Sequence, residues 1–404
     1  MQAIRYARIS DIIKEAKSGF ASGENLDSGT FQIRMNNITP DGQLDLSKRR
    51  RVSIGSKKSE SIMLNYGDVL FNATNSPALV GKSAFFGGCD EPVTFSNHFI
   101  RIRTNQDKVD GKYLARWLSY QFQNRIFEGM CRQWVNQATV GKEALLSLRI
   151  PVLPITEQRR IAAILDKTDA LRAKRREALA QLDSLTQSIF IEMFGDPVTN
   201  PLGWKSGTVQ DALDAGLILN IQDGNHGELH PKVSDFSETG VPFVMANCLS
   251  GGQLNVDVAY RLDPTWLKKL RVGFGKPNDV LLSHKGTVGE VAIVPSRQES
   301  VILSPQVTYY RTGRLLDSQF LAGYFKTAWF QAVLKKDAIQ STRAYIGITR
   351  QRSLPLVFPP LELQQEYARR SDFAEHLTTC CKTSLGQLDS LFSSLQHRAF
   401  RGEL

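Results

Sequence analysis

Two long stretches of the chain carry apolar residues at alternating intervals of three and four, the spacing of one helix face. They cover residues 156–193 and 361–399. Thr156 is a suitable N-cap for the first helix, and Phe194-Gly195-Asp196-Pro197 ends it, because glycine suits the C-cap and proline cannot continue a helix. Each apolar stripe is too narrow for a helix to be stable alone, so each helix needs a partner. The 38 residues of the first would span roughly 57 Å.

The two stripes have the same phase, 206 positions apart, which predicts a coiled-coil seam at equivalent positions of both helices. The residues predicted at the spacer-helix seam are Ile161, Ile164, Leu171, Leu182, Leu185 and Ile189 in the first helix and Leu377, Leu388, Leu391 and Leu395 in the second.

The chain repeats itself. Gln181-Leu182-Asp183-Ser184-Leu185 returns as Gln387-Leu388-Asp389-Ser390-Leu391, 206 positions later, and Gly67-Asp68-Val69-Leu70 is matched by Asn278-Asp279-Val280-Leu281. One unit of about two hundred residues is therefore written twice, which predicts an internal pseudo-two-fold.

The segments before the helices alternate short apolar runs with turn clusters, which is typical of short strands and a few helices. One helix is expected near residues 110–128. We predict an α/β (mixed α+β) fold with two domains of mixed strands and helices. The predicted divisions are 1–150 and 199–353 for these domains, and 151–198 and 354–404 for the connectors with their long helices.

The chain carries a net charge of +10, and the excess lies outside the helices. Residues 1–154 hold 21 Lys/Arg against 14 Asp/Glu, and residues 196–355 hold 17 against 14. A polyanion would be gripped by these segments, although solubility alone also explains such a charge. The five cysteines are scattered, and the first ten residues lack the apolar core of a signal peptide, so we expect a cytoplasmic protein.

Polar loops after predicted strands, and the segments before each connector, are the candidate DNA-reading surfaces, because amides, guanidinium groups and lysines contact base edges and phosphates. Ordinary polar turns are the alternative. The candidate residues are Lys48, Arg49, Arg50 and Lys57; Asn72, Thr74, Asn75 and Lys82; Gln133, Asn136 and Gln137; Ser283, His284, Lys285 and Thr287; and Gln340, Thr342, Arg343 and Tyr345.

Two short motifs partly match known sites, a phosphate-binding loop and a metal site, but neither match is complete. Gly81-Lys82-Ser83 lacks the glycine that a phosphate loop needs at Ser76, so a backbone phosphate contact is the better interpretation. The pair His226 and His230 does not have His-Glu-x-x-His spacing, and no Cys-x-x-Cys accompanies it. We expect no metal site and no catalytic residues in this chain.

Together these features resemble the specificity subunit of type I restriction–modification systems. The most specific pieces are residues 148–154 leading into Glu157-Gln158-Arg159-Arg160-Ile161-Ala162, residues 179–194, and the ending Ala399-Phe400-Arg401-Gly402-Glu403-Leu404. The second helix begins differently, with Glu362-Leu363-Gln364-Gln365.

The resemblance implies a non-catalytic subunit in which residues 1–150 and 199–353 are target-recognition domains, and each reads half of a bipartite DNA site. It also implies that the two long helices pack as an antiparallel coiled coil, which serves as a rigid spacer. It implies two methyltransferase subunits as partners, with restriction subunits in the full complex, and it leaves S-adenosylmethionine, ATP and magnesium to those partners. The alternatives are a related system with a fused methyltransferase-nuclease partner, and a coiled-coil adaptor that does not bind DNA.

Overall fold

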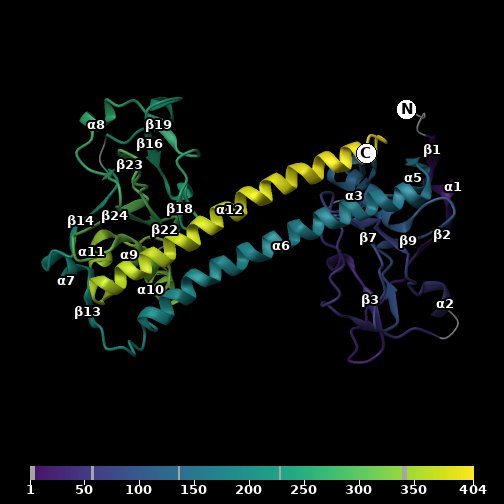
Figure 1. Ribbon diagram of the computed structural model, residues 1–404, viewed down its shortest axis with the longest axis horizontal. Coiled ribbons are helices and arrows are strands. Elements are labelled where there is room, and N and C mark those ends of the chain that lie inside the picture. The colour runs from purple at the N-terminus through teal and green to yellow at the C-terminus, as the bar shows by residue number, and fades with distance from the viewer. Residues whose placement is uncertain (1–4, 56–58, 135–136, 227–228, 339–343) are drawn as a thin grey trace. The chain divides into compact units, whose positions relative to one another are not determined.

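The computed structural model describes residues 5–55, 59–134, 137–226, 229–338 and 344–404, without the side chains of residues 59, 60, 133, 134 and 183. The chain forms two compact units, coloured by residue number in Figure 1. Unit 1 is Met1–Arg176 with Ser384–Leu404, and unit 2 is Glu177–Thr383. The division falls inside both long helices, α6 (Ile155–Phe194) and α12 (Leu361–Ala399). The two predicted helices are thus confirmed to within one residue at each end.

Each unit is built on a four-stranded antiparallel sheet. Unit 1 has the order β2-β9-β5-β7, with bounds Ile13–Ser18, Phe99–Thr104, Val69–Asn72 and Ser83–Phe85. Unit 2 has β14-β24-β21-β22, with bounds Ile218–Asp223, Val307–Thr312, Val280–Lys285 and Thr287–Ile293. Corresponding strands occupy the same places in the two sheets, so the duplication seen in the sequence is also a duplication of topology.

A second sheet in each unit contains one parallel pair. In unit 1 its order is β4-β3-β8 (Arg51–Val52, Thr30–Ile33, Val93–Phe95), and β3 and β8 are parallel. In unit 2 its order is β15-β19-β16-β23-β20 (Phe236–Ser237, Tyr260–Leu262, Val241–Val244, Val301–Leu303, Phe274–Gly275), and β16 and β23 are parallel.

Smaller sheets complete the strand pairings. β1 (Arg5–Arg8) pairs with β12 (Arg149–Val152), and β13 (Lys205–Thr208) pairs in the same way with β25 (Pro355–Phe358). The remaining strands are β10 (Arg132–Trp134), β11 (Gln137–Thr139) and β6 (Thr74–Asn75) in unit 1, and β17 (Leu249–Ser250) with β18 (Gln253–Leu254) in unit 2.

Short helices cover the sheets. Unit 1 contains α1 (Ile9–Ile12), α2 (Ser59–Ile62), α3 (Gly111–Gln123), α4 (Ile126–Met130) and α5 (Lys142–Ser147). Unit 2 contains α7 (Val209–Asp214), α8 (Trp266–Lys269), α9 (Ser318–Lys326), α10 (Ala328–Ala338) and α11 (Ile348–Arg352). The helix predicted at 110–128 is two helices, because Arg125 adopts a left-handed conformation (φ 58°) that ends the first.

Matched polar contacts hold equivalent elements in the two units. Arg103 donates two hydrogen bonds to Asp68 at 2.9 and 3.0 Å, and Arg311 donates two to Asp279 at 2.9 and 2.6 Å. Each aspartate precedes the central strand of its four-stranded sheet, and each arginine lies on the neighbouring strand. Bidentate pairs of this kind fix geometry as well as charge.

The beginnings of α6 and α12 are also held alike, despite their different sequences. The buried side chain of Gln158 accepts a hydrogen bond from the backbone N–H of Asp110 at 2.9 Å, and Gln364 accepts one from Asp317 at 2.8 Å. Asp110 and Asp317 are in turn the N-caps of α3 and α9. One glutamine therefore ties each long helix to the domain that precedes it.

Segments of α6 and α12 pack against each other within each unit, and in unit 1 they run in opposite directions. In unit 1, Arg160 lies near Leu404, and Arg172 lies near Asp389. In unit 2, the ring centroids of Phe190 and Tyr367 are 5.3 Å apart. The two contacts in unit 1 give opposite directions, and the contact in unit 2 shows that the helices also pack together there.

Of the ten residues predicted at the seam, six are buried or half-buried and four are exposed. One continuous stripe of buried or half-buried positions on α6 consists of Gln158, Ile161, Leu165, Thr168, Arg172, Arg175, Leu179, Leu182 and Thr186. Adding 206 gives the stripe of α12: Gln364, Tyr367, Ser371, Ala374, Thr378, Cys381, Leu385, Leu388 and Phe392. Of the predicted seam residues, Ile161 is buried, and Ile164, Leu182, Ile189, Leu388 and Leu395 are half-buried.

Leu171, Leu185, Leu377 and Leu391 are exposed, by 36–49%, so their assignment to the seam is wrong. The reason is visible at Arg172, which takes the inward place that hydropathy gives to Leu171. Arg172 donates hydrogen bonds to Asp389 at 2.6 Å and to Asp169 at 2.9 Å. Its guanidinium also lies 4.4 Å from the ring centroid of Phe392. Pairing and the aromatic face offset the cost of burying this charge.

A close approach at Gly323 yields a stability prediction. A Cβ atom on Gly323 of α9 would lie 2.3 Å from the hydroxyl oxygen of the buried Tyr367, so Gly323→Ala is expected to destabilise the protein by about 1–3 kcal/mol. The control is Gly386→Ala on an exposed part of α12, where a Cβ would meet nothing within 4 Å. It should stabilise by about 0.5–1 kcal/mol. Denaturant unfolding of the two full-length variants measures both effects; equal stability would contradict the packing.

Within the described part of the chain, no helix is both long enough and apolar enough to cross a membrane.

Candidate nucleic-acid interface

In unit 1, the loop after β5 and the segment before the first connector meet in one sheet. β6 pairs with β11, so that Thr74 lies opposite Thr139 and Asn75 lies opposite Ala138. The hydroxyl oxygens of Thr74 and Thr139 are 3.2 Å apart. Two groups of residues that the sequence proposes separately for DNA contact are therefore neighbours.

Unit 2 brings the corresponding segments together at the end of β21. Lys285 forms a β-bridge with Tyr345, and the backbone N–H of Gly286 donates to the carbonyl of Ala344 at 3.1 Å. Lys285 and Thr287 are exposed, and Tyr345 is 41% exposed. We call each such place a strand-end cluster: residues 74–75 and 137–139 in unit 1, and residues 285–287 and 344–345 in unit 2.

Four of the proposed DNA contacts are contradicted by burial. Asn72 and Ser283 are fully buried; the amide of Asn72 donates to the carbonyls of Thr74 and His98, and the hydroxyl of Ser283 accepts from the backbone N–H of Glu290. His284 is also fully buried. Equivalent strand residues 72 and 283 therefore shape the loops that follow them and do not face solvent.

Lys82 is the fourth correction. It is 5% exposed, and its ammonium group donates to the carbonyls of Met35 at 3.0 Å and Ile38 at 2.5 Å. Burial lowers the pKa of this lysine. A lysine held in this way cannot reach a phosphate, so neither the phosphate loop nor the backbone phosphate contact is supported. Its stem and donors instead anchor the turn after β3.

The other proposed residues divide into two groups. Thr74 and Asn75 are half-buried and Gln137 is exposed, all within the unit 1 strand-end cluster. Lys57, Asn136, Gln340, Thr342 and Arg343 lie outside the described residues, as does the side chain of Gln133 in β10.

The predicted basic cluster forms the wall of a hollow in unit 1. The hollow is lined by Asn25, Arg34, Asn36, Lys48, Arg49 and Arg50. Glu91 pairs with Arg49 at 2.7 Å, and Lys48 lies 3.3 Å from Asp45, so these two charges are partly compensated. Arg50 donates to the backbone carbonyls of Ser22 and Glu24.

Arg34 is the residue of this hollow that sequence reasoning missed. Among the described residues no carboxylate lies within 4.0 Å of its guanidinium, and burial and the charge of Arg50 lower its pKa. It directly follows β3, so the rule that selected the other strand-end loops would also have selected it. An arginine beside other cations is suited to a phosphate, which would relieve the repulsion.

His98 connects the basic hollow to the strand-end cluster of unit 1. Its carbonyl accepts hydrogen bonds from the N–H groups of Ala73 and Thr74 at 2.8 and 3.2 Å. Burial and the charge of Arg34 lower the pKa of its ring. The backbone of His98 therefore borders the strand-end cluster, and its ring lies within range of the charge of Arg34.

The basic hollow predicts a change in the salt dependence of DNA binding. Arg34→Gln should reduce the slope of log K against log salt concentration by about 0.9, the contribution of one phosphate contact to duplex DNA. Arg160→Gln is the matched control, because Arg160 lies on α6 and pairs with Glu157 at 2.8 Å. Titrations at several salt concentrations measure the slope. A slope unchanged by Arg34→Gln would remove the hollow from the interface.

Comparisons with known proteins agree with this geometry. A family model described as a type I restriction modification DNA specificity domain matches residues 5–181. The chain is 23% identical to the putative type I restriction enzyme MjaX specificity subunit of Methanocaldococcus jannaschii, over 98% of this chain and 92% of that protein. It is 19% identical to the EcoBI specificity subunit of Escherichia coli, over 81% of this chain and 73% of that protein.

A solved structure has the same fold. The type I S subunit from M. genitalium matches with a TM-score of 0.58 at 14% identity, covering 99% of this chain and 97% of that one.

Proposed function

Because the chain belongs to the specificity subunits of type I restriction–modification systems, we propose that it is the DNA-recognition and scaffolding subunit of such a complex. In this proposal it reads a bipartite, asymmetric DNA site and carries no catalysis. The observation that supports it best is the pair of strand-end clusters. They occupy equivalent places in a duplicated scaffold and carry different side chains: Thr74, Asn75 and Gln137 against Lys285, Thr287 and Tyr345.

Equivalent scaffolds with different reading residues are what an asymmetric two-part site requires. The scaffold presents each cluster at the end of the same strand, while threonine, amide, lysine and tyrosine groups make different contacts with base edges and phosphates. In unit 1 the basic hollow adds backbone contacts next to the cluster. At the position of Arg34, unit 2 has Met245 directly after β16.

Partners are methyltransferase and restriction subunits, and we propose two copies of the methyltransferase. The exposed leucines support two docking places, because Leu171 and Leu377 are 206 positions apart, as are Leu185 and Leu391. Unit 1 contains Leu171 and Leu391, and unit 2 contains Leu185 and Leu377. Exposed apolar residues on a helix pair are suited to a protein partner.

Docking at these leucines can be tested by co-purification. The single variants Leu391→Glu and Leu377→Glu should each halve the methyltransferase that co-purifies with the chain, and the double variant should abolish co-purification. Glu362→Lys, on the exposed first turn of α12, is the charge-changing control. Full co-purification with the double variant would contradict the docking places.

In the same proposal S-adenosylmethionine, ATP and magnesium act on the partner subunits. A methyltransferase-nuclease fused in one partner chain is the alternative system, and the partner gene content distinguishes the two.

Duplex selection tests the proposal against a coiled-coil adaptor that binds only proteins. The chain, purified with its methyltransferase partner, should retain from a random pool duplexes with one two-part motif, and salt should weaken the binding. Scrambling either half of the motif should abolish retention. Retention without any shared motif would contradict the proposed function.

A further inference from the structure

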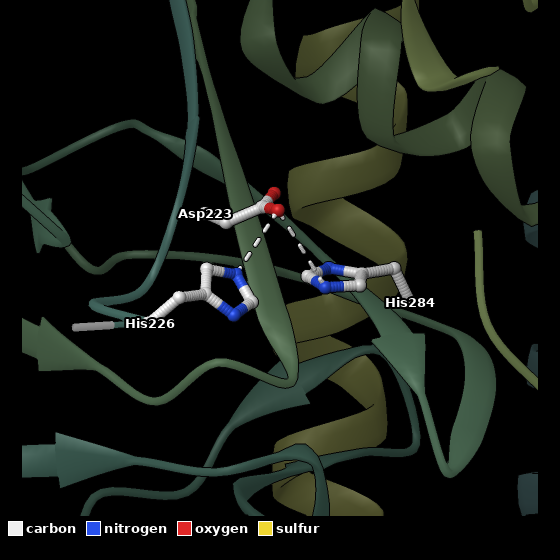
Figure 2. Close-up of side chains that lie close together, drawn as sticks. All are labelled: Asp223, His226 and His284. Carbon is white, nitrogen blue, oxygen red and sulfur yellow. Dashed lines mark hydrogen bonds and ion pairs between the residues drawn. The ribbon is translucent and has the colours of Figure 1, made fainter. Parts of the chain in front are cut away.

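Unit 2 contains a cluster of two imidazoles and a carboxylate that its proposed role in DNA recognition does not use (Figure 2). Asp223 is the last residue of β14, His226 lies in the segment that follows, and His284 is on β21. The Nε2 atoms of His226 and His284 lie 3.3 and 3.8 Å from the same carboxylate oxygen, Oδ2 of Asp223. One potential ligand atom from each residue lies within 4.8 Å of the others.

The hydrogen bonds around His284 determine what its second nitrogen presents. The hydroxyl of Thr308 lies 2.5 Å from Oδ1 of Asp223, which only accepts when ionised, so Thr308 donates to it. The hydroxyl oxygen of Thr308 also lies 2.7 Å from Nδ1 of His284. Because the hydroxyl proton already points to Asp223, this oxygen accepts a hydrogen bond from Nδ1. His284 is thus oriented as the tautomer that carries its proton on Nδ1.

The remaining nitrogen of His284 consequently presents a lone pair toward Asp223. His284 is fully buried, and its Nε2 atom has no hydrogen-bond partner among the described residues. Its distance of 3.8 Å from the carboxylate oxygen is too long for a hydrogen bond. Two buried acceptors that face each other repel, and a cation bound between them would remove the repulsion.

The dimensions suit a divalent transition-metal ion. Bonds of about 2.0–2.1 Å to nitrogen and oxygen in a tetrahedron place neighbouring ligand atoms about 3.3 Å apart. His226 Nε2 lies 3.3 Å from Asp223 Oδ2, and His284 Nε2 lies 3.8 Å from the same oxygen. The hydroxyl of Thr308 would act as the outer-shell group that fixes the tautomer and ring orientation of a ligand histidine.

We propose that Asp223, His226 and His284 form a binding site for a zinc-class divalent ion. Three protein ligands leave one tetrahedral position for water or another ligand. The bound ion would fasten the segment after β14 to the end of β21, directly beside the strand-end cluster. The ring of His284 lies 5.7 Å from that of Tyr345, and Lys285 is the next residue.

Among the described residues, unit 1 has no equivalent of this site. In unit 1, the residue that corresponds to Asp223 is Ser18, at the end of β2. The residue that corresponds to His284 is Ala73. The backbone N–H of Ala73 donates to the carbonyl of His98, just as the backbone N–H of His284 donates to the carbonyl of Gln306. Neither side chain is a metal ligand. The next residues, Gly19 and Gly224, are also equivalent: a Cβ atom added to either would lie within 2.3 Å of a backbone carbonyl oxygen. The two units therefore share the backbone at this place but not the metal-binding side chains.

The site also differs from the His226–His230 pair considered from the sequence. His230 is not in the cluster; its ring faces Phe243 at a centroid distance of 6.2 Å. Sequence spacing alone led to the expectation of no metal, because Asp223 and His284 come from two strands that only the fold brings together.

Metal binding to the full-length chain tests the proposal. Co²⁺ added to metal-free protein should bind at one ion per chain and give the visible absorption of tetrahedral cobalt, and Zn²⁺ should displace it. Zn²⁺ should also raise the melting temperature. His226→Gln, at a half-exposed position, should weaken Co²⁺ binding at least about tenfold.

His230→Gln is the matched control and should bind Co²⁺ like the unaltered chain, because it removes a nearby histidine outside the cluster. Circular dichroism of both variants checks that they fold. The proposal is overturned if the unaltered chain binds no stoichiometric Co²⁺ or Zn²⁺, or if His226→Gln binds as tightly as His230→Gln. These readouts use the ion alone, so they are independent of DNA binding and of the proposed function.

Discussion

Inserting seven residues into both α6 and α12 is expected to lengthen the unread gap of the DNA site by about three base pairs. The insertions belong between Arg176 and Glu177 and between Thr383 and Ser384, where the chain passes from one unit to the other. Seven residues add about 10.5 Å of helix, and base pairs are stacked about 3.4 Å apart. Seven residues are also close to two helical turns, so the inward stripe keeps its phase.

The lengthened site should be bound more weakly than the original one. Three base pairs turn one half-site by roughly a third of a turn around the duplex, and the seven-residue insertion does not supply that rotation. The control is the same insertion in α6 alone, which leaves α12 seven residues short and should abolish methylation. Methylation mapping in cells reports the gap. A gap unchanged by the double insertion would show that the helices do not set it.

Exchanging the second recognition domain for that of another specificity subunit should change one half-site completely and leave the other half unaltered. The expected boundaries 199–353 need adjustment, because β13 pairs with β25 (Pro355–Phe358). An exchange of residues 199–358 keeps both strands of this pair from the same parent. The hydrogen bond from the backbone N–H of Asp317 to Gln364 must be kept as well, which requires a donor subunit with a residue other than proline at the α9 N-cap.

The reciprocal exchange, of residues 5–152, is the control and should change only the other half-site. Sequencing of methylated sites measures both outcomes. A change in both halves with either exchange would contradict the division of the reading surface between the two units.

The long helices could be predicted because their signals are local and strong. Periodicity and the stop at Gly195-Asp196-Pro197 placed α6 within one residue at each end. Thr156 is not the N-cap that the sequence predicts, because the helix already begins at Ile155. The inward face of the helix could not be predicted equally well. Two different stripes along α6 share the positions 161, 168, 175 and 182, and they differ only in which neighbouring residues they add. Leu171 is the more apolar choice, and only the positions of Asp169, Asp389 and Phe392 make Arg172 the buried one.

The reading loops could be located from sequence, but their exposure could not. Thr74, Gln137, Lys285 and Tyr345 lie in the strand-end clusters, as the loops after strands and before connectors indicated. Lys82 belongs to the same loop by sequence and is nevertheless buried, because the carbonyls of Met35 and Ile38 come from a segment more than forty residues away. Long-range contacts of this kind leave no local pattern.

The central claim is that this chain determines which DNA sequence its complex recognises. The most direct measurement is a map of methylated adenines in cells that express the chain together with its methyltransferase partner. We predict one asymmetric two-part motif with a methylated adenine on each strand, and its loss when this chain is deleted. A motif that persists without the chain, or methylation with no motif at all, would contradict the claim.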